Sequence, residues 1–187
     1  MARQAPITED VEGLGYVEDF LGEDEEQEVL GMLDALEFRT ITMRGQTAKR
    51  TVRHFGLDYD YEGGRLVPAE PLPAELEFVR DRCAALMERA AADLVQILVS
   101  RYPPGAGIGW HRDAPMFGSK IAGVSLGAPC RMRFQRTVGG VRRVSELELA
   151  PRSAYLLSGK ARWSWQHSIP ATTALRHSIT FRTLKRG

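Results

Sequence analysis

Residues 95–102, VQILVSRY, open the run of short apolar segments that decides the fold. The run continues with KIAGVSL (120–126), CRMRFQR (130–136), VSELELA (144–150), SAYLLSG (153–159), WSWQHSI (163–169) and RHSITFRTL (176–184). These segments are β-branched or alternating, and Gly and Pro separate them, which is typical of β-strands. No helical period occurs after residue 93. We therefore expect about seven strands, folded as a sandwich or jelly roll over residues 94–184.

Two helices are expected before these strands. The first begins in the acidic stretch from Gly22 to Glu28, because negative charges stabilise a helix N-terminus, and its apolar face holds Val29, Leu30, Leu33 and Leu36. The second follows Pro71 and Pro73, and its apolar stripe holds Leu76, Val79, Cys83, Leu86, Met87 and Ala90. The expected fold class is therefore α+β, in a single domain over residues 1–187 whose residues 1–12 are frayed.

The composition is that of an ordinary soluble domain. The chain has 187 residues, of which 43% are hydrophobic and 26% charged. No apolar run is long enough for a membrane span, and the N-terminus lacks the apolar region of a secretory signal. The cysteines, Cys83 and Cys130, have no partner motif, which suits a reducing compartment. We expect a cytoplasmic monomer without membrane contact.

The near-neutral net charge of +1 hides a strong asymmetry along the chain. Residues 1–100 hold 10 Lys and Arg against 21 Asp and Glu, a balance of −11. Residues 101–187 hold 15 Lys and Arg against 3 Asp and Glu, a balance of +12. The segment from Phe38 to Leu57 adds five cations and no acid. A basic field of this kind favours a polyanionic partner such as nucleic acid, although an arginine-rich solvated surface has the same composition.

Three residues have the pattern of a metal site. His111 and Asp113, in GWHRDAP, are two residues apart, so on a strand their side chains point to the same face. A jelly roll could return His167, in WSWQHSIP, to the same place. Two His and one carboxylate form the facial triad of non-haem Fe(II) oxygenases, which leaves the remaining positions open for substrate and dioxygen. The alternative is a surface His–Asp pair and a separate core histidine.

Arg176 and Arg182 strengthen the metal interpretation. Their even offset places both on one face of a predicted strand, toward an apolar interior. A buried guanidinium is costly unless it meets an anion. Two such arginines beside a metal predict a bound dicarboxylate or a ligand carboxylate that needs orienting, with structural ion pairs as the alternative.

Together these motifs resemble the AlkB family of Fe(II)/2-oxoglutarate dioxygenases, in its small bacterial branch. The resemblance covers about Gly13 to Leu184 and rests on ILVSRYPPGAGIGWHRD, KIAGVSLGAPCRMRF, ARWSWQHSIP and LRHSITFR. It implies a double-stranded β-helix core that binds Fe(II), 2-oxoglutarate and dioxygen. It also implies oxidative demethylation of alkylated bases in DNA or RNA, as in DNA repair, with release of an aldehyde.

The resemblance also implies roles for single residues. His111, Asp113 and His167 would be the catalytic iron ligands. Arg176 would bind the distal carboxylate of 2-oxoglutarate together with Tyr102, and Arg182 would lie near Asp113 and the keto-acid end. Family members often carry Asn at the position of Ser100, and some carry an acidic base contact at the position of Pro115.

Residues 38–65 correspond to the nucleotide-recognition lid of that family. Aromatic side chains hold a flipped base and cations hold its flanking phosphates. From the lid we expect Arg53, His54, Phe55 and Tyr59 near the base, and Lys49 and Arg50 on phosphate. Trp110, Trp163 and Trp165 are expected to pack in the barrel.

Other functions remain open at this point. An AlkB-like oxygenase could instead hydroxylate a tRNA side group or a protein side chain. A zinc hydrolase could use the same His, Asp and His, and a jelly roll could hold nucleic acid without turnover. The zinc hydrolase leaves Arg176 and Arg182 unexplained, and a pure binding module has no need for open metal positions.

Overall fold

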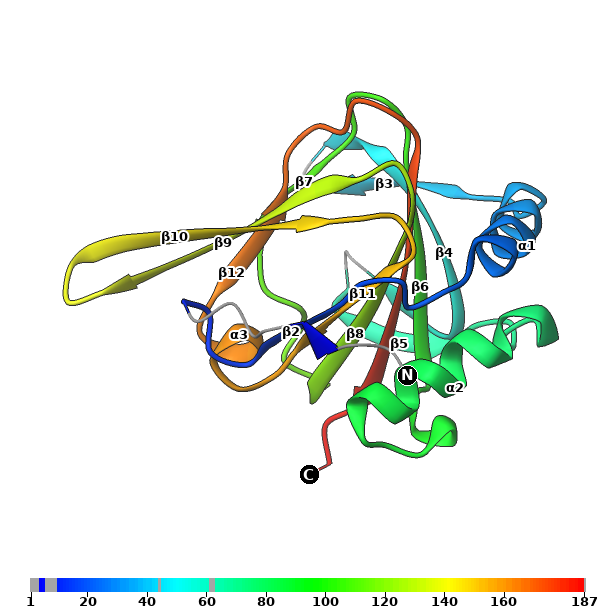
Figure 1. Cartoon of the computed structure of the whole chain (residues 1–187), viewed down its shortest axis with the longest axis horizontal. Helices are drawn as coiled ribbons and strands as arrows, with labels where there is room; N and C mark the ends of the chain where they lie inside the picture. The colour runs from blue at the N-terminus through cyan, green and yellow to red at the C-terminus, as the bar shows by residue number, and fades with distance from the viewer. Residues whose placement is uncertain (1–3, 6–9, 44, 61–62, 187) are drawn as a thin grey trace.

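The computed structural model describes residues 4–5, 10–43, 45–60 and 63–186, and these form two antiparallel sheets that face each other (Figure 1). The strands are β1 (Gln4–Ala5), β2 (Leu14–Val17), β3 (Arg39–Met43), β4 (Gln46–Asp60), β5 (Arg65–Pro68), β6 (Gln96–Tyr102), β7 (Ile108–His111), β8 (Phe117–Gly127), β9 (Cys130–Val138), β10 (Val141–Leu149), β11 (Ser153–Leu157), β12 (Gln166–Ile169) and β13 (Arg176–Leu184). Within those residues, the larger sheet has nine strands in the order β1-β2-β11-β8-β13-β6-β4-β3, with β5 paired to β4. The smaller sheet has four, in the order β10-β9-β12-β7. The fold is jelly-roll-like.

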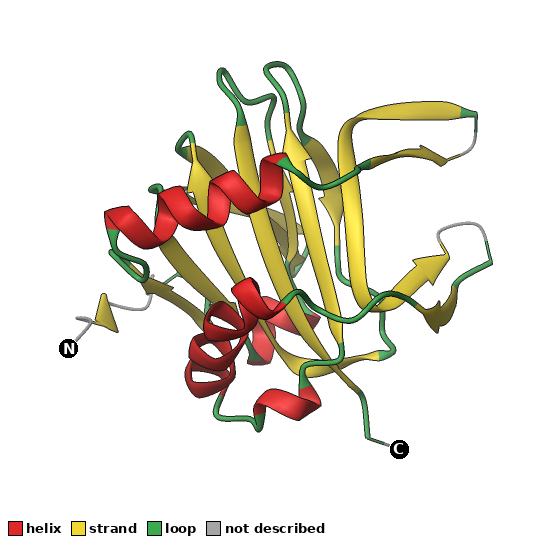
Figure 2. Cartoon of the chain, turned by 90° about the vertical axis from the view of Figure 1, so that its right-hand side faces the viewer, coloured by secondary structure: helices red, strands yellow, loops and turns green. Residues whose placement is uncertain are grey.

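Two hydrophobic clusters cover the two faces of the larger sheet. One fills the space between the sheets, where Tyr102 and Ile121 of the larger sheet meet Phe134 and Ile169 of the smaller one. The other lies between the larger sheet and the helices α1 (Glu23–Asp34) and α2 (Glu77–Met87), which Figure 2 shows packed on one face of that sheet. Strands buried on both faces read as continuous apolar runs, as β6 and β8 do.

The sequence explains where the two long helices begin. The first turn of α1 holds four acidic residues, and the Glu25 carboxylate accepts a hydrogen bond of 2.8 Å from the backbone N–H of Gly22. In α2 the residues Val79, Cys83 and Met87 are buried at helical spacing. Short 3₁₀ turns, Ala74–Leu76 and Ala91–Asp93, flank α2. No helix in the described part of the chain is long and apolar enough to cross a membrane.

The expectation of no helix after residue 93 was wrong at one place. Residues Gly159–Trp163 form a short helix, α3, between β11 and β12. A single helical turn is too short to show a period in sequence, and only its end residues, Gly159 and Trp163, fall within the expected strands. The range 94–184 holds eight strands instead of the expected seven. The additional strand is the short β7, which lies in a Gly-rich stretch.

The hairpin of β9 and β10 is longer than the sheet to which it belongs. The two strands pair over nine residues, from Cys130 with Leu149 to Val138 with Val141. The neighbouring β12 pairs with only three of them, Arg133, Phe134 and Gln135. The outer half of the hairpin therefore projects from the body of the molecule, as Figure 1 shows.

Candidate active site

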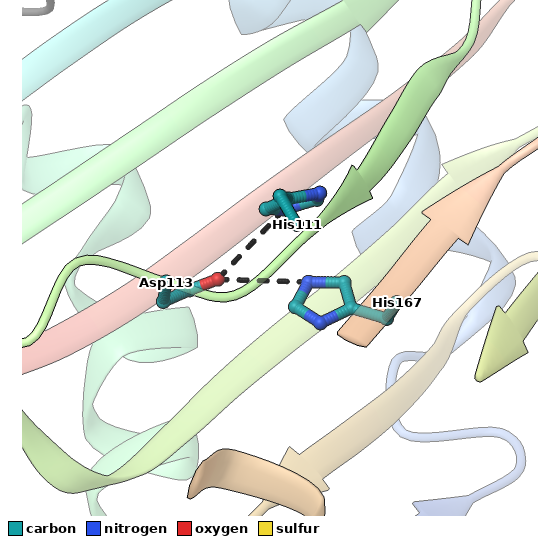
Figure 3. A group of neighbouring side chains, drawn as sticks. All are labelled: His111, Asp113 and His167. Carbon is teal, nitrogen blue, oxygen red and sulfur yellow. Dashed lines mark ion pairs between the residues drawn. The ribbon is translucent and has the colours of Figure 1, made fainter. Parts of the chain in front are cut away.

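His111, Asp113 and His167 come together on the inner face of the smaller sheet (Figure 3). His111 ends β7 and is paired in register with His167 of β12. Asp113 lies in the loop after β7, and its Oδ1 is 3.5 Å from Nε2 of His167 and 3.9 Å from Nε2 of His111. One ligand atom from each residue lies within 4.8 Å of the others. This set of two imidazoles and one carboxylate suits Fe(II).

Burial and nearby charges hold the three residues in the protonation states that bind metal. Burial lowers the pKa of His167 to about 3 and also lowers the pKa of His111, so both imidazoles are neutral near pH 7. Burial raises the pKa of Asp113, but Arg182 and the two histidines outweigh it and bring that pKa below its ordinary value. Nδ1 of His111 donates to the Gly109 carbonyl at 2.8 Å, which leaves Nε2 for a metal.

Two arginines fix the position of Asp113. Nε of Arg182 donates to Oδ2 of Asp113 at 2.7 Å, so that Oδ1 faces the histidines. Arg162, from α3, donates to backbone carbonyls of the loop after β7, including that of Asp113 at 3.1 Å, and to two carbonyls at the start of β8. Sequence reasoning placed Arg182 here but missed Arg162. Nothing in the local pattern indicated that Arg162 is buried, because its role depends on how α3 packs.

Arg176 is a buried cation that lacks an anion. Its side chain is 0% exposed, and its Nε donates to the Ser125 hydroxyl at 3.0 Å. Among the described residues, Nη1 and Nη2 have no hydrogen-bond partner. The guanidinium lies 4.9 Å from the ring centroid of Tyr102, in an inner cavity that also reaches His111 and Asp113. A buried, unsatisfied guanidinium is costly, so this position fits a carboxylate ligand.

Arg50 lies inside the protein, which corrects the expectation of a phosphate contact. Arg50 is 8% exposed, and its Nη1 donates to the Ser100 hydroxyl at 3.1 Å. Its guanidinium lies 5.9 Å from the ring centroid of Tyr102, and the residue lines both the inner cavity and the larger outer one. The reason is register, because Arg50 is on the inward-facing side of β4, opposite Tyr102 and beside Ser100.

The same alternation removes Arg53 and Phe55 from the base-binding set. Both point to the helix side of β4, where Phe55 is buried under α1 and α2 and Arg53 pairs with Glu70. Neither lines the outer cavity. Lys49 is exposed on that side of the strand. The sequence marked these residues as basic and aromatic, but it did not give the face to which each one points.

His54 and Tyr59 do line the outer cavity. Gln96 Nε2 donates to Nδ1 of His54 at 3.1 Å, and burial lowers the pKa of His54 to about 4. Tyr59 follows Gly56, which has φ +74° and leaves no room for a Cβ beside the Val95 carbonyl. At Gly56 β4 leaves β6 and begins to pair with β5, and this change turns Tyr59 toward the cavity.

The outer cavity has a volume of about 530 Å³ and reaches the metal cluster through His111 and Asp113. Side chains of β3 and β4, namely Ile41, Gln46 and Tyr59, form one wall. The opposite wall comes from β7 and its loop, with Trp110, Arg112, Pro115 and Phe117. The volume of the outer cavity lies within the range of small-molecule sites and is large enough for a nucleobase.

The three tryptophans have different environments. Trp165 is buried in the core between the sheets, as expected. Trp163 is 40% exposed, so its expected place in the barrel was wrong. Trp110 is half-buried at the edge of the outer cavity, and the guanidinium groups of Arg133 and Arg142 lie over its ring.

Comparison with known proteins agrees with this geometry. The family model described as the 2OG-Fe(II) oxygenase superfamily matches residues 13–182. The chain is 32% identical to "Alkylated DNA repair protein ALKBH8 homolog" of Arabidopsis thaliana, covering 86% of this chain and 51% of that protein. It is also 32% identical to "tRNA (carboxymethyluridine(34)-5-O)-methyltransferase alkbh8" of Xenopus tropicalis, covering 84% and 25%. The chain therefore spans only a quarter to a half of these relatives.

A solved structure shares the fold. The structure of OsALKBH1 superposes with a TM-score of 0.71 over 96% of this chain and 99% of that one, at 16% identity.

Proposed function

The chain belongs to the 2OG-Fe(II) oxygenase superfamily as a member of its AlkB family, and from that premise we propose that it dealkylates bases in DNA or RNA. As a dioxygenase of this family it uses Fe(II), 2-oxoglutarate and dioxygen. The observation that carries the proposal is Arg176, a fully buried cation with two donor nitrogens that find no partner in the described part of the chain, beside a His, Asp and His cluster.

In this proposal His111, Asp113 and His167 hold the Fe(II), and Arg182 keeps Asp113 in its ligand orientation. Arg176 binds the distal carboxylate of 2-oxoglutarate, with the Tyr102 hydroxyl as a further donor. When bound, the metal and cosubstrate supply oxidation of a C–H bond, in which 2-oxoglutarate and dioxygen become succinate, carbon dioxide and a substrate hydroxyl group. A hydroxymethyl group on a base nitrogen then leaves as formaldehyde, and the free base remains.

The protein's own contribution is to hold the base and exclude water. In this proposal the segment 38–65 acts as the nucleotide-recognition lid, and its residues Tyr59 and His54 line the outer cavity, which reaches the metal cluster. An alkylated base must leave its stack to reach this depth. Lys49 is exposed, and in this proposal it contacts a flanking phosphate.

The test is incubation with Fe(II), 2-oxoglutarate and air, after anaerobic reconstitution, on a panel of methylated and etheno oligonucleotides. We expect mass spectrometry to find loss of the alkyl group, with one succinate formed for each group lost. The Asp113→Asn protein is the matched inactive control. Succinate formation that no member of the panel stimulates would remove alkylated nucleobases as the substrate.

The second candidate function is hydroxylation of a tRNA side group or a protein side chain. It is favoured by Pro115, which lines the cavity where some base-repair members carry an acidic base contact. The name of the Xenopus relative refers to a modified tRNA uridine. In the same assay this activity adds one oxygen to the substrate without loss of carbon, so the two outcomes are distinct by mass.

A zinc hydrolase or a binding module without turnover is less consistent with the cavity. Neither has a use for Arg176, whose free donors need a carboxylate. Location in the cytoplasm and a monomeric state remain predictions. Both cysteines are free and buried, which is compatible with a reducing compartment.

Arg50 lines the inner cavity together with Tyr102 and Arg176, so we propose that it binds 2-oxoglutarate there and does not contact phosphate. We expect Arg50→Met to weaken 2-oxoglutarate binding by about 10- to 100-fold, since a lost charge-assisted donor costs about 1.5–3 kcal/mol. We expect no change in the salt dependence of nucleic-acid binding, because the guanidinium is buried. Lys49→Met, its exposed neighbour, should have the opposite pattern and lower the salt slope by about 0.7–0.9.

Calorimetric titration with 2-oxoglutarate and anisotropy titrations of a labelled oligonucleotide measure the two quantities. A reduced salt slope with normal 2-oxoglutarate affinity in Arg50→Met would restore the phosphate role.

A further inference from the structure

The projecting β9–β10 hairpin is rich in arginine. Between Arg131 and Glu148 it has five arginines and two glutamates, and its outer half, RTVGGVRRV at residues 136–144, has three arginines and no acid. Val138, Val141 and Val144 are also exposed there, Val141 by 63%. The outer half has no pairing strand beyond its own partner in the described part of the chain. Its side chains are therefore available to a partner.

Most of these arginines lack a carboxylate. Arg131 lies 3.5 Å from Glu146, but the other four, which we call the hairpin arginines, have no ion pair among the described residues. They are Arg133, Arg136, Arg142 and Arg143. Arg136 and Arg143 are directly opposite each other in the ladder, so they share one face, where the Arg136 guanidinium lies 5.5 Å from the Trp165 ring centroid. Arg133 and Arg142 lie on the other face of the hairpin. Like charges in such a cross-strand pair destabilise a hairpin. The placement of Arg143 opposite Arg136 is therefore not explained by the stability of the fold. Binding of an external anion explains it.

Two of the hairpin arginines, Arg133 and Arg142, connect to the active site through Trp110. The Arg133 guanidinium lies 5.0 Å from the Trp110 ring centroid, and that of Arg142 lies 5.9 Å from it. Trp110 directly precedes His111 and lines the outer cavity. Arg112, exposed on the same wall, adds another cation. Positive charge thus extends from the rim of the cavity onto the hairpin.

We propose that the hairpin arginines bind the phosphate backbone of the nucleic acid whose target base enters the outer cavity. The inference rests on the proposed function and adds a second contact surface, on the opposite side of the cavity from the lid. Guanidinium groups suit phosphate oxygens because their planar donors make two parallel hydrogen bonds. Such contacts fix the position of the strand without reading its sequence.

The test compares Arg142→Gln/Arg143→Gln with a control that loses the same charge elsewhere, Arg89→Gln/Arg186→Gln. Arg89 follows α2, and Arg186 is near the C-terminus, where its side chain is 88% exposed. Each protein is loaded anaerobically with Fe(II) and 2-oxoglutarate. Its affinity for a fluorescent oligonucleotide that contains 1-methyladenine is then measured by anisotropy over a range of salt concentrations.

We expect the slope of log affinity against log salt to fall by about 1.4–1.8 in the hairpin variant, from two contacts of about 0.7–0.9 each. The control should keep the wild-type slope, and Arg142→Lys/Arg143→Lys should keep most of it. Calorimetric 2-oxoglutarate affinity should be unchanged in all variants, which verifies the fold.

Two results would contradict the proposal in different ways. A steep wild-type slope that is unchanged in the hairpin variant would overturn the hairpin contact alone. A flat wild-type slope would overturn nucleic acid as the substrate, and the hairpin contact with it.

Discussion

Replacement of Asp113 by asparagine is expected to abolish both Fe(II) binding and 2-oxoglutarate turnover. The Asp113 carboxylate is the only anionic donor in the cluster, and its side chain is 4% exposed, so water cannot easily replace it. Loss of residues that merely orient a ligand costs about 10–100-fold in affinity or activity, and loss of a ligand should cost more. His111→Ala and His167→Ala should have the same effect, because a facial site has no spare ligand.

Metal content after anaerobic reconstitution and succinate formation measure this effect. Asp81→Asn, which neutralises an exposed acid on α2, is the matched control and should retain both properties. Succinate formation at the wild-type rate in any of the three ligand variants would contradict the assignment of the metal site.

Replacement of Arg176 by methionine should have two opposite effects. It should weaken 2-oxoglutarate binding by on the order of 2–5 kcal/mol, because the distal carboxylate would lose its buried, charge-assisted partner. It should also raise the thermal stability of the ligand-free protein. The wild-type guanidinium is buried with two unsatisfied nitrogens, and an apolar side chain of similar length avoids that desolvation cost. The unpaired guanidinium of Arg176 lowers the stability of the ligand-free protein but binds the ligand, so its replacement should both weaken 2-oxoglutarate binding and raise stability.

Calorimetric titration with 2-oxoglutarate and thermal unfolding without ligand test the two effects separately. Arg176→Lys should recover part of the affinity, since it keeps the charge but not the planar pair of donors. Arg101→Met, an exposed position on the adjacent strand β6, is the control and should change neither property. Wild-type 2-oxoglutarate affinity in Arg176→Met would show that another group holds the distal carboxylate.

Local patterns were sufficient to predict the centre of the site. Strand alternation gave Arg176 and Arg182 a common face, and the structure places both on the inward side of β13. The spacing of His111 and Asp113 required only that two positions on one segment point the same way. His167 depended on the order of strands, and the resemblance to a known family supplied that order. These inferences succeeded because alternation in a strand is a property of the backbone alone.

The tertiary structure decided which side chains of β4 reach the site. The sequence of residues 38–65 is basic and aromatic, but only the pairing of β4 with β6 sends Arg50 inward and Phe55 into the core below the helices. A one-residue shift in that register would exchange the two faces, and composition does not encode the register. The buried role of Arg162 and the projection of the β9–β10 hairpin likewise depend on which elements pack beside them. The sequence by itself indicated the residue types of the centre, because all of these residues except Asp113 lie within short strands, and Asp113 is two residues beyond the end of β7. The surroundings of that centre depended on contacts between distant segments, whose geometry exists only after the chain has folded.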